Sequence, residues 1–98
     1  MNAYMLSFTS KTGVVTRQNI LDFLDTRREV LHWFAAMPFT IILVSRATHV
    51  AVAELLRSKF GNHITFLLSK IEPHTIDGYI NQQVWDFINN PKSSGRWE

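Results

Sequence analysis

The apolar and polar positions along the chain follow two alternating patterns. Some segments are runs of apolar and β-branched residues, which favour strands, and others space their apolar residues by three and four, which favours amphipathic helices. The predicted elements, in order, are a strand at 4–9, a helix capped by Thr16, strands at 30–36 and 39–44, a helix capped by Thr48, a strand at 63–71 and a short helix capped by Asn81.

Turn-forming and helix-ending residues stand where these patterns change. Pro38 lies between two strand-like runs and predicts a hairpin turn, because proline cannot donate to the ladder of a central strand. Gly61 follows the second helical pattern and is suited to a left-handed C-cap. Pro91 stops the final helix.

This order of elements predicts an α+β fold of the ferredoxin-like βαββαβ class. The expected molecule has a four-stranded antiparallel sheet, two helices on one face and a short C-terminal helix. We assign residues 1–91 to a single domain that includes this helix, and we expect residues 92–98 to form a flexible polar tail.

The strands are apolar on both faces of the predicted sheet, whereas two helices can cover only one. Residues 31, 33 and 35 of one strand are expected to share a sheet face with residues 42 and 44 of the next. Residues 34 and 36 are expected to share the other face with residues 39, 41 and 43. Either the C-terminal segment folds across the second face or a second copy packs against it. We favour a homodimer, and the candidate interface residues are Leu31, Trp33, Ile42, Val44 and Trp85.

Composition identifies a small globular domain and leaves its partner open. The chain has 98 residues, of which 46% are hydrophobic and 18% charged, and this excludes a disordered chain. The net charge of +2 is only a weak sign of nucleic-acid binding, and scattered solubilising charge explains it better. The candidate contacts to phosphate are Lys11, Arg17, Arg27, Arg28 and Arg46.

The sequence contains no cysteine, which excludes disulfides and thiolate metal sites and fits a cytoplasmic location. The start of the chain lacks the pattern of a signal peptide. The apolar run Val30–Val44 covers about 15 residues against the roughly 20 that cross a bilayer, so we expect no membrane association.

No pattern of residues names a reaction. The four histidines show no metal-ligand spacing, the glycines are too far apart to form a phosphate-binding loop, and no nucleophile motif is present. We therefore assign no catalytic, cofactor-binding or metal-binding residue.

Three segments carry a resemblance: the first strand Tyr4–Phe8, the stretch Leu31–Phe34, and the segment from Gly78 to Ile88. They are similar to small bacterial ferredoxin-like proteins of unknown role, which in turn resemble the small subunit of the CRISPR adaptation complex and its VapD-like ribonuclease relatives. The resemblance implies a homodimer and a link to nucleic acid or to defence against mobile elements and phage. Active members of that group carry a metal-binding Asp at the end of the first strand, where this chain has Thr9 and Ser10.

The expected function is therefore a non-enzymatic, homodimeric interaction module that binds a protein or nucleic-acid partner and needs no cofactor. The alternative is a metal-dependent nuclease or ribonuclease of the same fold with a degenerate site.

Overall fold

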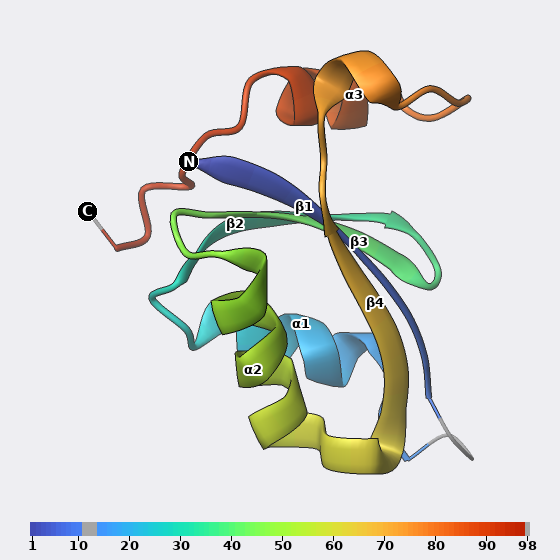
Figure 1. Ribbon diagram of the computed structural model, residues 1–98, viewed down its shortest axis with the longest axis vertical. Coiled ribbons are helices and arrows are strands. Elements are labelled where there is room, and N and C mark those ends of the chain that lie inside the picture. The colour runs from blue at the N-terminus through green and yellow to red at the C-terminus, as the bar shows by residue number, and fades with distance from the viewer. Residues whose placement is uncertain (11–13, 98) are drawn as a thin grey trace.

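The computed structural model describes residues 1–10 and 14–97, which form a sheet between two layers of helices (Figure 1). The strands and helices, in chain order, are β1 (Asn2–Ser10), α1 (Arg17–Asp25), β2 (Val30–Met37), β3 (Thr40–Ser45), α2 (His49–Phe60), β4 (Ile64–Lys70) and α3 (Gln82–Asn89). Two short 3-10 turns, at Gly61–His63 and Pro73–Thr75, lie on either side of β4.

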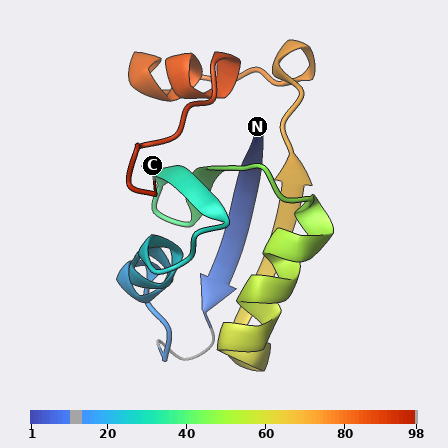
Figure 2. The ribbon, with the colours of Figure 1, turned by 90° about the vertical axis from the view of Figure 1, so that its left-hand side faces the viewer.

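The sheet has the predicted topology. Within the described residues its four strands are arranged in the order β2-β3-β1-β4, and every neighbouring pair is antiparallel. Helices α1 and α2 lie on one face and α3 lies on the other (Figures 1 and 2). The ferredoxin-like βαββαβ prediction is confirmed.

The predicted caps hold the helix ends. The Thr16 hydroxyl accepts a hydrogen bond from the Asn19 amide at 3.1 Å, and the Asn19 side chain accepts one from the Thr16 amide at 2.8 Å. These reciprocal bonds form a capping box. Thr48 caps α2 through the Ala51 amide at 3.2 Å. Gly61 has a φ of 56°, in the left-handed region that glycine adopts without strain.

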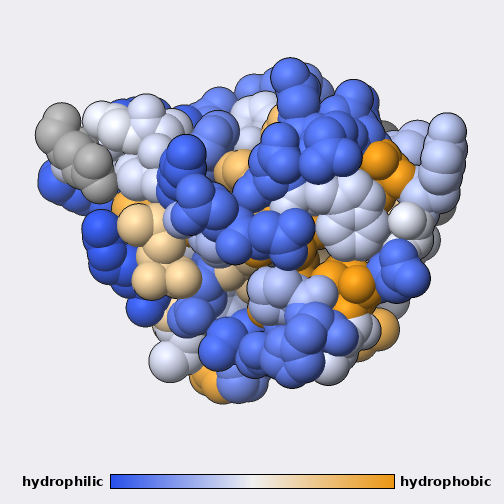
Figure 3. All heavy atoms as spheres, turned by 90° about the horizontal axis from the view of Figure 1, so that it is seen from above, coloured by the Kyte–Doolittle hydropathy of each residue, from blue (hydrophilic) through white to orange (hydrophobic). Residues whose placement is uncertain are grey.

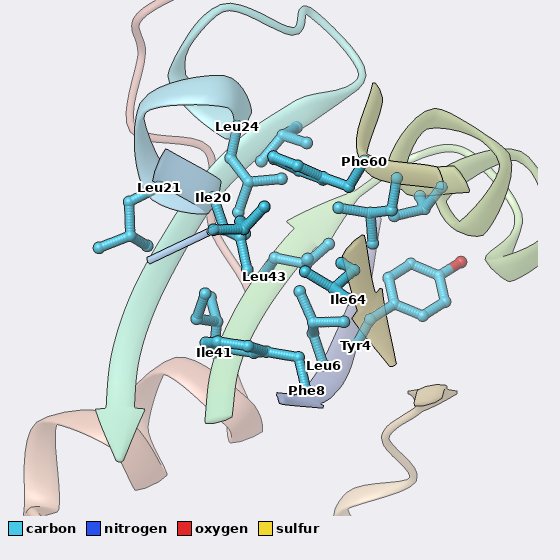
Figure 4. Packing of buried hydrophobic residues seen from close by; sticks show 14 residues of the cluster. Tyr4, Leu6, Phe8, Ile20, Leu21, Leu24, Ile41, Leu43, Phe60 and Ile64 are labelled. Atoms are coloured by element: carbon cyan, nitrogen blue, oxygen red, sulfur yellow. The ribbon is translucent and has the colours of Figure 1, made fainter. Parts of the chain in front are cut away.

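The larger core lies between the sheet and the helix pair α1–α2 (Figure 4). Leu6 of β1 and Leu43 of β3 are fully buried there against Ile20 of α1 and Leu56 of α2. The buried ring of Tyr4 keeps its hydroxyl satisfied, because that hydroxyl donates to the Ala47 carbonyl at 2.6 Å. This core explains why one sheet face is apolar.

A second core lies beneath α3 on the opposite face. Val84 and Ile88 of α3 are buried together with Ala3 of β1, Ile42 of β3 and Ile71. Viewed from the α3 side, hydrophilic residues cover most of the surface and hydrophobic residues show between them (Figure 3). The sequence left two ways to cover this second face, and the structure shows that α3 of the same chain covers part of it.

The end of the chain also has a defined place. Within the segment 92–98, predicted to be a flexible polar tail, the described residues 92–97 lie against the start of β2: the Ser94 amide donates to the Leu31 carbonyl at 2.9 Å. Arg96 forms an ion pair with Asp25 at 2.6 Å. The partners of the tail exist only once the chain has folded, which is why a polar composition alone did not predict this contact. In the described part of the chain, no helix is long and apolar enough to span a membrane.

Candidate interaction surfaces

The register of the β2–β3 hairpin assigns its apolar side chains to the two faces. Trp33 pairs with Leu43, and both pack on the helix side, whereas Ile42 lies beneath α3. The prediction that grouped Trp33 with Ile42 on one face is therefore wrong. The register depends on the geometry of the turn and on an irregularity between Val30 and His32, and neither can be read from alternation alone.

The five side chains expected at a dimer interface all have contacts within the chain. Leu31, Ile42 and Val44 are buried, with exposed fractions of 6%, 2% and 0%. Trp33 and Trp85 are half-buried, the first against the helix-side core and the second against the core beneath α3. A second copy that bound these side chains would have to displace α3 or the helix pair. The homodimer stays a prediction, and its surface must lie elsewhere.

Helix α3 covers only part of its sheet face. Beyond α3, where the C-terminal half of β1 pairs with the N-terminal half of β4, four side chains are exposed: Ser7, Thr9, Thr65 and Leu67. They surround a shallow hollow of about 290 Å³. Leu67 is 78% exposed, an apolar side chain among small polar ones.

The outer edge of β4 is open. In the part of the chain that the structure describes, β4 pairs with β1 alone, in continuous register along its whole length. The Ile71 amide, just beyond β4, donates to the Ala3 carbonyl at 2.9 Å. Because hydrogen-bonding direction alternates along a strand, the backbone groups of Phe66, Leu68 and Lys70 point away from β1. These backbone groups are positioned to form hydrogen bonds with an added strand.

The opposite edge of the sheet, at β2, is partly closed by the end of the chain. Besides the bond from Ser94 to Leu31, the Val30 carbonyl accepts from the Trp97 indole at 3.3 Å and from the Arg96 guanidinium at 3.4 Å. The irregular register of β2 further disfavours pairing with a straight strand.

A groove runs between the open edge of β4 and helix α2, which lie side by side (Figure 2). Its volume is about 520 Å³. From α2 it is lined by His49, Val50, Ala53 and Arg57, and Val50 is 59% exposed. Leu67 lines it from β4. We call the open backbone edge of β4, together with this groove, the β4 edge site.

A second hollow lies under α3 and is mainly apolar. It has a volume of about 290 Å³ and is lined by Met5, Ile42, Trp85 and Ile88, together with residues 76–80. Tyr79 stands at its rim and is fully exposed.

Of the four predicted phosphate contacts within the described residues, three lie at one end of the sheet and the fourth at the other. Arg27, Arg28 and Arg46 lie at the end of the sheet where β2 begins and β3 ends. Arg17 lies at the other end, with its Nη1 3.5 Å from the Met37 carbonyl. Lys11 lies outside the described residues.

Neighbouring groups already engage the adjacent pair Arg27 and Arg28. Arg27 forms an ion pair with Glu29 at 3.0 Å, and the hydrogen bond from Arg27 is the main reason why the pKa of Glu29 is lowered. The Arg28 guanidinium lies 5.4 Å from the centre of the Trp97 ring, a cation–π contact. Both arginines therefore have structural partners.

The titratable groups of the described residues do not form a metal cluster, since no three His, Asp or Glu side chains gather closely enough to hold an ion. His32 is half-buried, with its ring centroid 5.0 Å from that of Phe87. Burial lowers the pKa of His32, and the positive charge of Arg96 lowers it further.

The sequence analysis missed the β4 edge site. Its signal was present: in the predicted topology the last strand is an edge strand, and Leu67 stands alone between Thr65 and Ser69 on a polar face. The informative part of this signal is the edge position, because the unpaired backbone groups of an edge strand can pair with another chain.

Comparisons with protein-family models, curated proteins and solved structures found no match for this chain. The fold and the surfaces therefore define the class: within the described residues, a small ferredoxin-like α+β domain whose β2 edge is contacted at its start by residues 94–97 and whose β4 edge is unpaired.

Proposed function

We propose that this protein is a binding module for another polypeptide chain, which it recognises by accepting a strand at the β4 edge site. One observation carries the proposal: the regular outer edge of β4 is unpaired within the described residues, with Val50 exposed in the groove on its α2 side and Leu67 exposed on the opposite face of the sheet. Main-chain hydrogen bonds would supply affinity, and the groove would select side chains of the incoming strand.

The contrast between the two edges supports this function. Natural sheets close their edges with bulges, charges or covering segments, because a free edge invites pairing. Here the β2 edge has both a bulge and the docked C-terminal segment, whereas β4 carries a single charged side chain, Lys70, at its very end. A seven-residue strand in regular register, with four apolar residues and its outer edge unpaired, is suited to a partner.

Nucleic acid is the competing partner, because the resemblance to the CRISPR-associated proteins implies a link to nucleic acid. Binding through phosphate requires cations that converge on one surface and are free to exchange counterions. Arg27 is paired with Glu29, Arg57 with Glu54 and Arg96 with Asp25. The apolar edge therefore favours a polypeptide.

Backbone hydrogen exchange, followed by NMR, tests strand addition whatever the occupant. The probe is a peptide with the sequence of residues 63–71. An occupied edge slows exchange of the outward amides of Phe66, Leu68 and Lys70 by at least about tenfold, while the inward amide of Leu67 is protected throughout. The variant K70P should weaken peptide binding, because it removes an outward donor while sparing the ladder with β1.

The proposal is overturned if these outward amides exchange at unprotected rates at every protein and peptide concentration. Salt-sensitive binding of RNA or DNA that the double variant R27E/R28E abolishes would show a nucleic-acid protein instead. Cleavage of either nucleic acid that depends on Mg²⁺ or Mn²⁺ would show the alternative, a nuclease.

A further inference from the structure

We propose that the strand accepted at the β4 edge site is β4 of a second copy of this chain, antiparallel and related by a two-fold axis beside Leu67. This inference rests on the proposed function and names its partner. The sheet then continues from one copy into the other, and α2 of each copy lies next to α2 of its partner.

The hydrogen-bonding pattern of β4 fits such an axis. The outward-pointing residues Phe66 and Leu68 lie symmetrically on either side of Leu67. In an antiparallel pair centred there, Phe66 exchanges backbone hydrogen bonds with the partner's Leu68, and Leu68 does so with the partner's Phe66. Leu67 meets the partner's Leu67 in a non-hydrogen-bonded pair, the arrangement in which opposite side chains are closest.

The side chains on each face of the pair match in kind. On the sheet face that also carries α3, Leu67 covers its own symmetry mate, which removes the most exposed aliphatic side chain of the strand from water. On the same face Thr65 lies opposite the partner's Ser69, a pair of small hydroxyl side chains. On the helix side, the half-buried Phe66 lies beside the partner's half-buried Leu68.

Charge selects the antiparallel arrangement. Lys70 is the one charged residue of β4, and antiparallel pairing about Leu67 places it opposite the partner's Ile64. Parallel pairing in register would instead place Lys70 against the partner's Lys70, which is unfavourable. The two-fold axis therefore pairs every apolar position with an apolar one, apart from the strand ends, and brings no like charges together.

Helix α2 can complete the contact. The residues that line the groove from α2 include Val50 and Ala53. Ala53 lies near the middle of the helix, as Leu67 lies in the middle of β4, so both are near the proposed axis. A small side chain at that point lets two helices approach closely.

The test is the oligomeric state of the full chain, measured by sedimentation and light scattering across the micromolar range. The wild-type protein is expected to be a dimer. L67E and L67K should each be monomeric, because like charges then meet at the axis, and mixing the two variants should restore a dimer. The control is Y79E, which changes an exposed aromatic residue at the rim of the hollow under α3, outside the residues that line the groove at β4, and should stay dimeric.

Cysteine cross-linking tests the register directly, since the chain has no cysteine of its own. L67C should form an intermolecular disulfide on mild oxidation, because residues opposite each other in a non-hydrogen-bonded pair have a suitable Cα separation of about 4.5 Å. T65C alone should not cross-link, whereas T65C mixed with S69C should do so. Unchanged circular dichroism of every variant confirms that the substitutions at these exposed positions leave the fold intact.

A wild-type chain that stays monomeric, or a dimer that L67E leaves intact, overturns this inference. The proposed function survives that result if a strand peptide still protects the outward amides of β4. If neither a second copy nor a peptide protects them, both the inference and the proposed function fail.

Discussion

The guanidinium of Arg96 lies 2.6 Å from the carboxylate of Asp25, across 71 positions of the chain. The same carboxylate oxygen accepts a hydrogen bond from the Trp33 indole at 2.7 Å. Asp25, the last residue of α1, therefore connects that helix to the middle of β2 and to residues 92–97. This junction holds residues 94–97 against the start of β2, where they partly close its edge.

Substitution R96A should release the C-terminal segment at a small cost in stability. The ion pair is partly exposed, with side-chain exposures of 31% and 44%, so we expect a loss of about 1 kcal/mol in urea unfolding. Exchange of the Ser94 amide should become faster, because its bond to Leu31 depends on the docked segment. The control is R57A, which removes an ion pair with Glu54 within α2. It should lower the free energy of unfolding by less than about 0.5 kcal/mol. Unchanged exchange at Ser94 would contradict this role for Arg96.

A chain that ends at Pro91 should associate further than the full chain, because its β2 edge is then open as well. Light scattering should show species larger than those of the full-length protein. Addition of L67E to the shortened chain should limit this growth, since only the β2 edge then remains for pairing. If the shortened chain keeps the size of the full chain, the docked segment does not guard this edge.

Helix α3 should contribute strongly to stability through Ile88. This side chain is 2% exposed beneath the helix, and I88A should lower the free energy of unfolding by about 2–4 kcal/mol. The variant should also bind more of a hydrophobic dye, because the sheet face under α3 becomes accessible. The matched control is Q83A, an exposed residue of the same helix, for which we expect little change. A loss below about 1 kcal/mol would mean that α3 does not pack firmly on the sheet.

The sequence predicted the elements of this fold well, because their signals are local. Thr16, Thr48 and Asn81 cap the helices as expected, and Gly61 ends α2 at a positive φ of 56°, although its ψ of −131° differs from that of the predicted left-handed helical cap. Each of these signals depends on residues within one turn of the position concerned, so no knowledge of the tertiary structure was needed.

The surfaces were predicted less well, because they depend on contacts between distant segments. The face on which Trp33 lies follows from the hairpin register, and the place of the C-terminal segment follows from the bond between Arg96 and Asp25. The apolar excess of the second face indicated a cover, and composition alone could not distinguish α3 from a second copy. Leu67 became informative only once β4 was known to be an edge strand.

The stability of the protein should fall as the pH falls below the ordinary histidine pKa of 6.5, because of His32. Burial and the charge of Arg96 lower the pKa of His32 in the folded state, so below pH 6.5 the unfolded chain binds more protons than the folded one. This contribution is complete above pH 6.5 and is lost as the pH falls through the folded-state pKa. Protonation at Nδ1 would also remove the acceptor of the Trp33 amide, which lies 2.9 Å away.

Urea unfolding at pH values from about 5 to about 8 measures this dependence. The variant H32N should flatten the slope near pH 6, because its amide oxygen replaces Nδ1 as an acceptor and does not titrate. R96A should reduce the slope in part, since the Arg96 charge is the smaller of the two causes. H74N, a change at an exposed histidine outside the packed regions, should leave the slope as it is in the wild type. An equal slope in H32N and the wild-type protein would show that His32 remains as easily protonated in the folded chain as in the unfolded one.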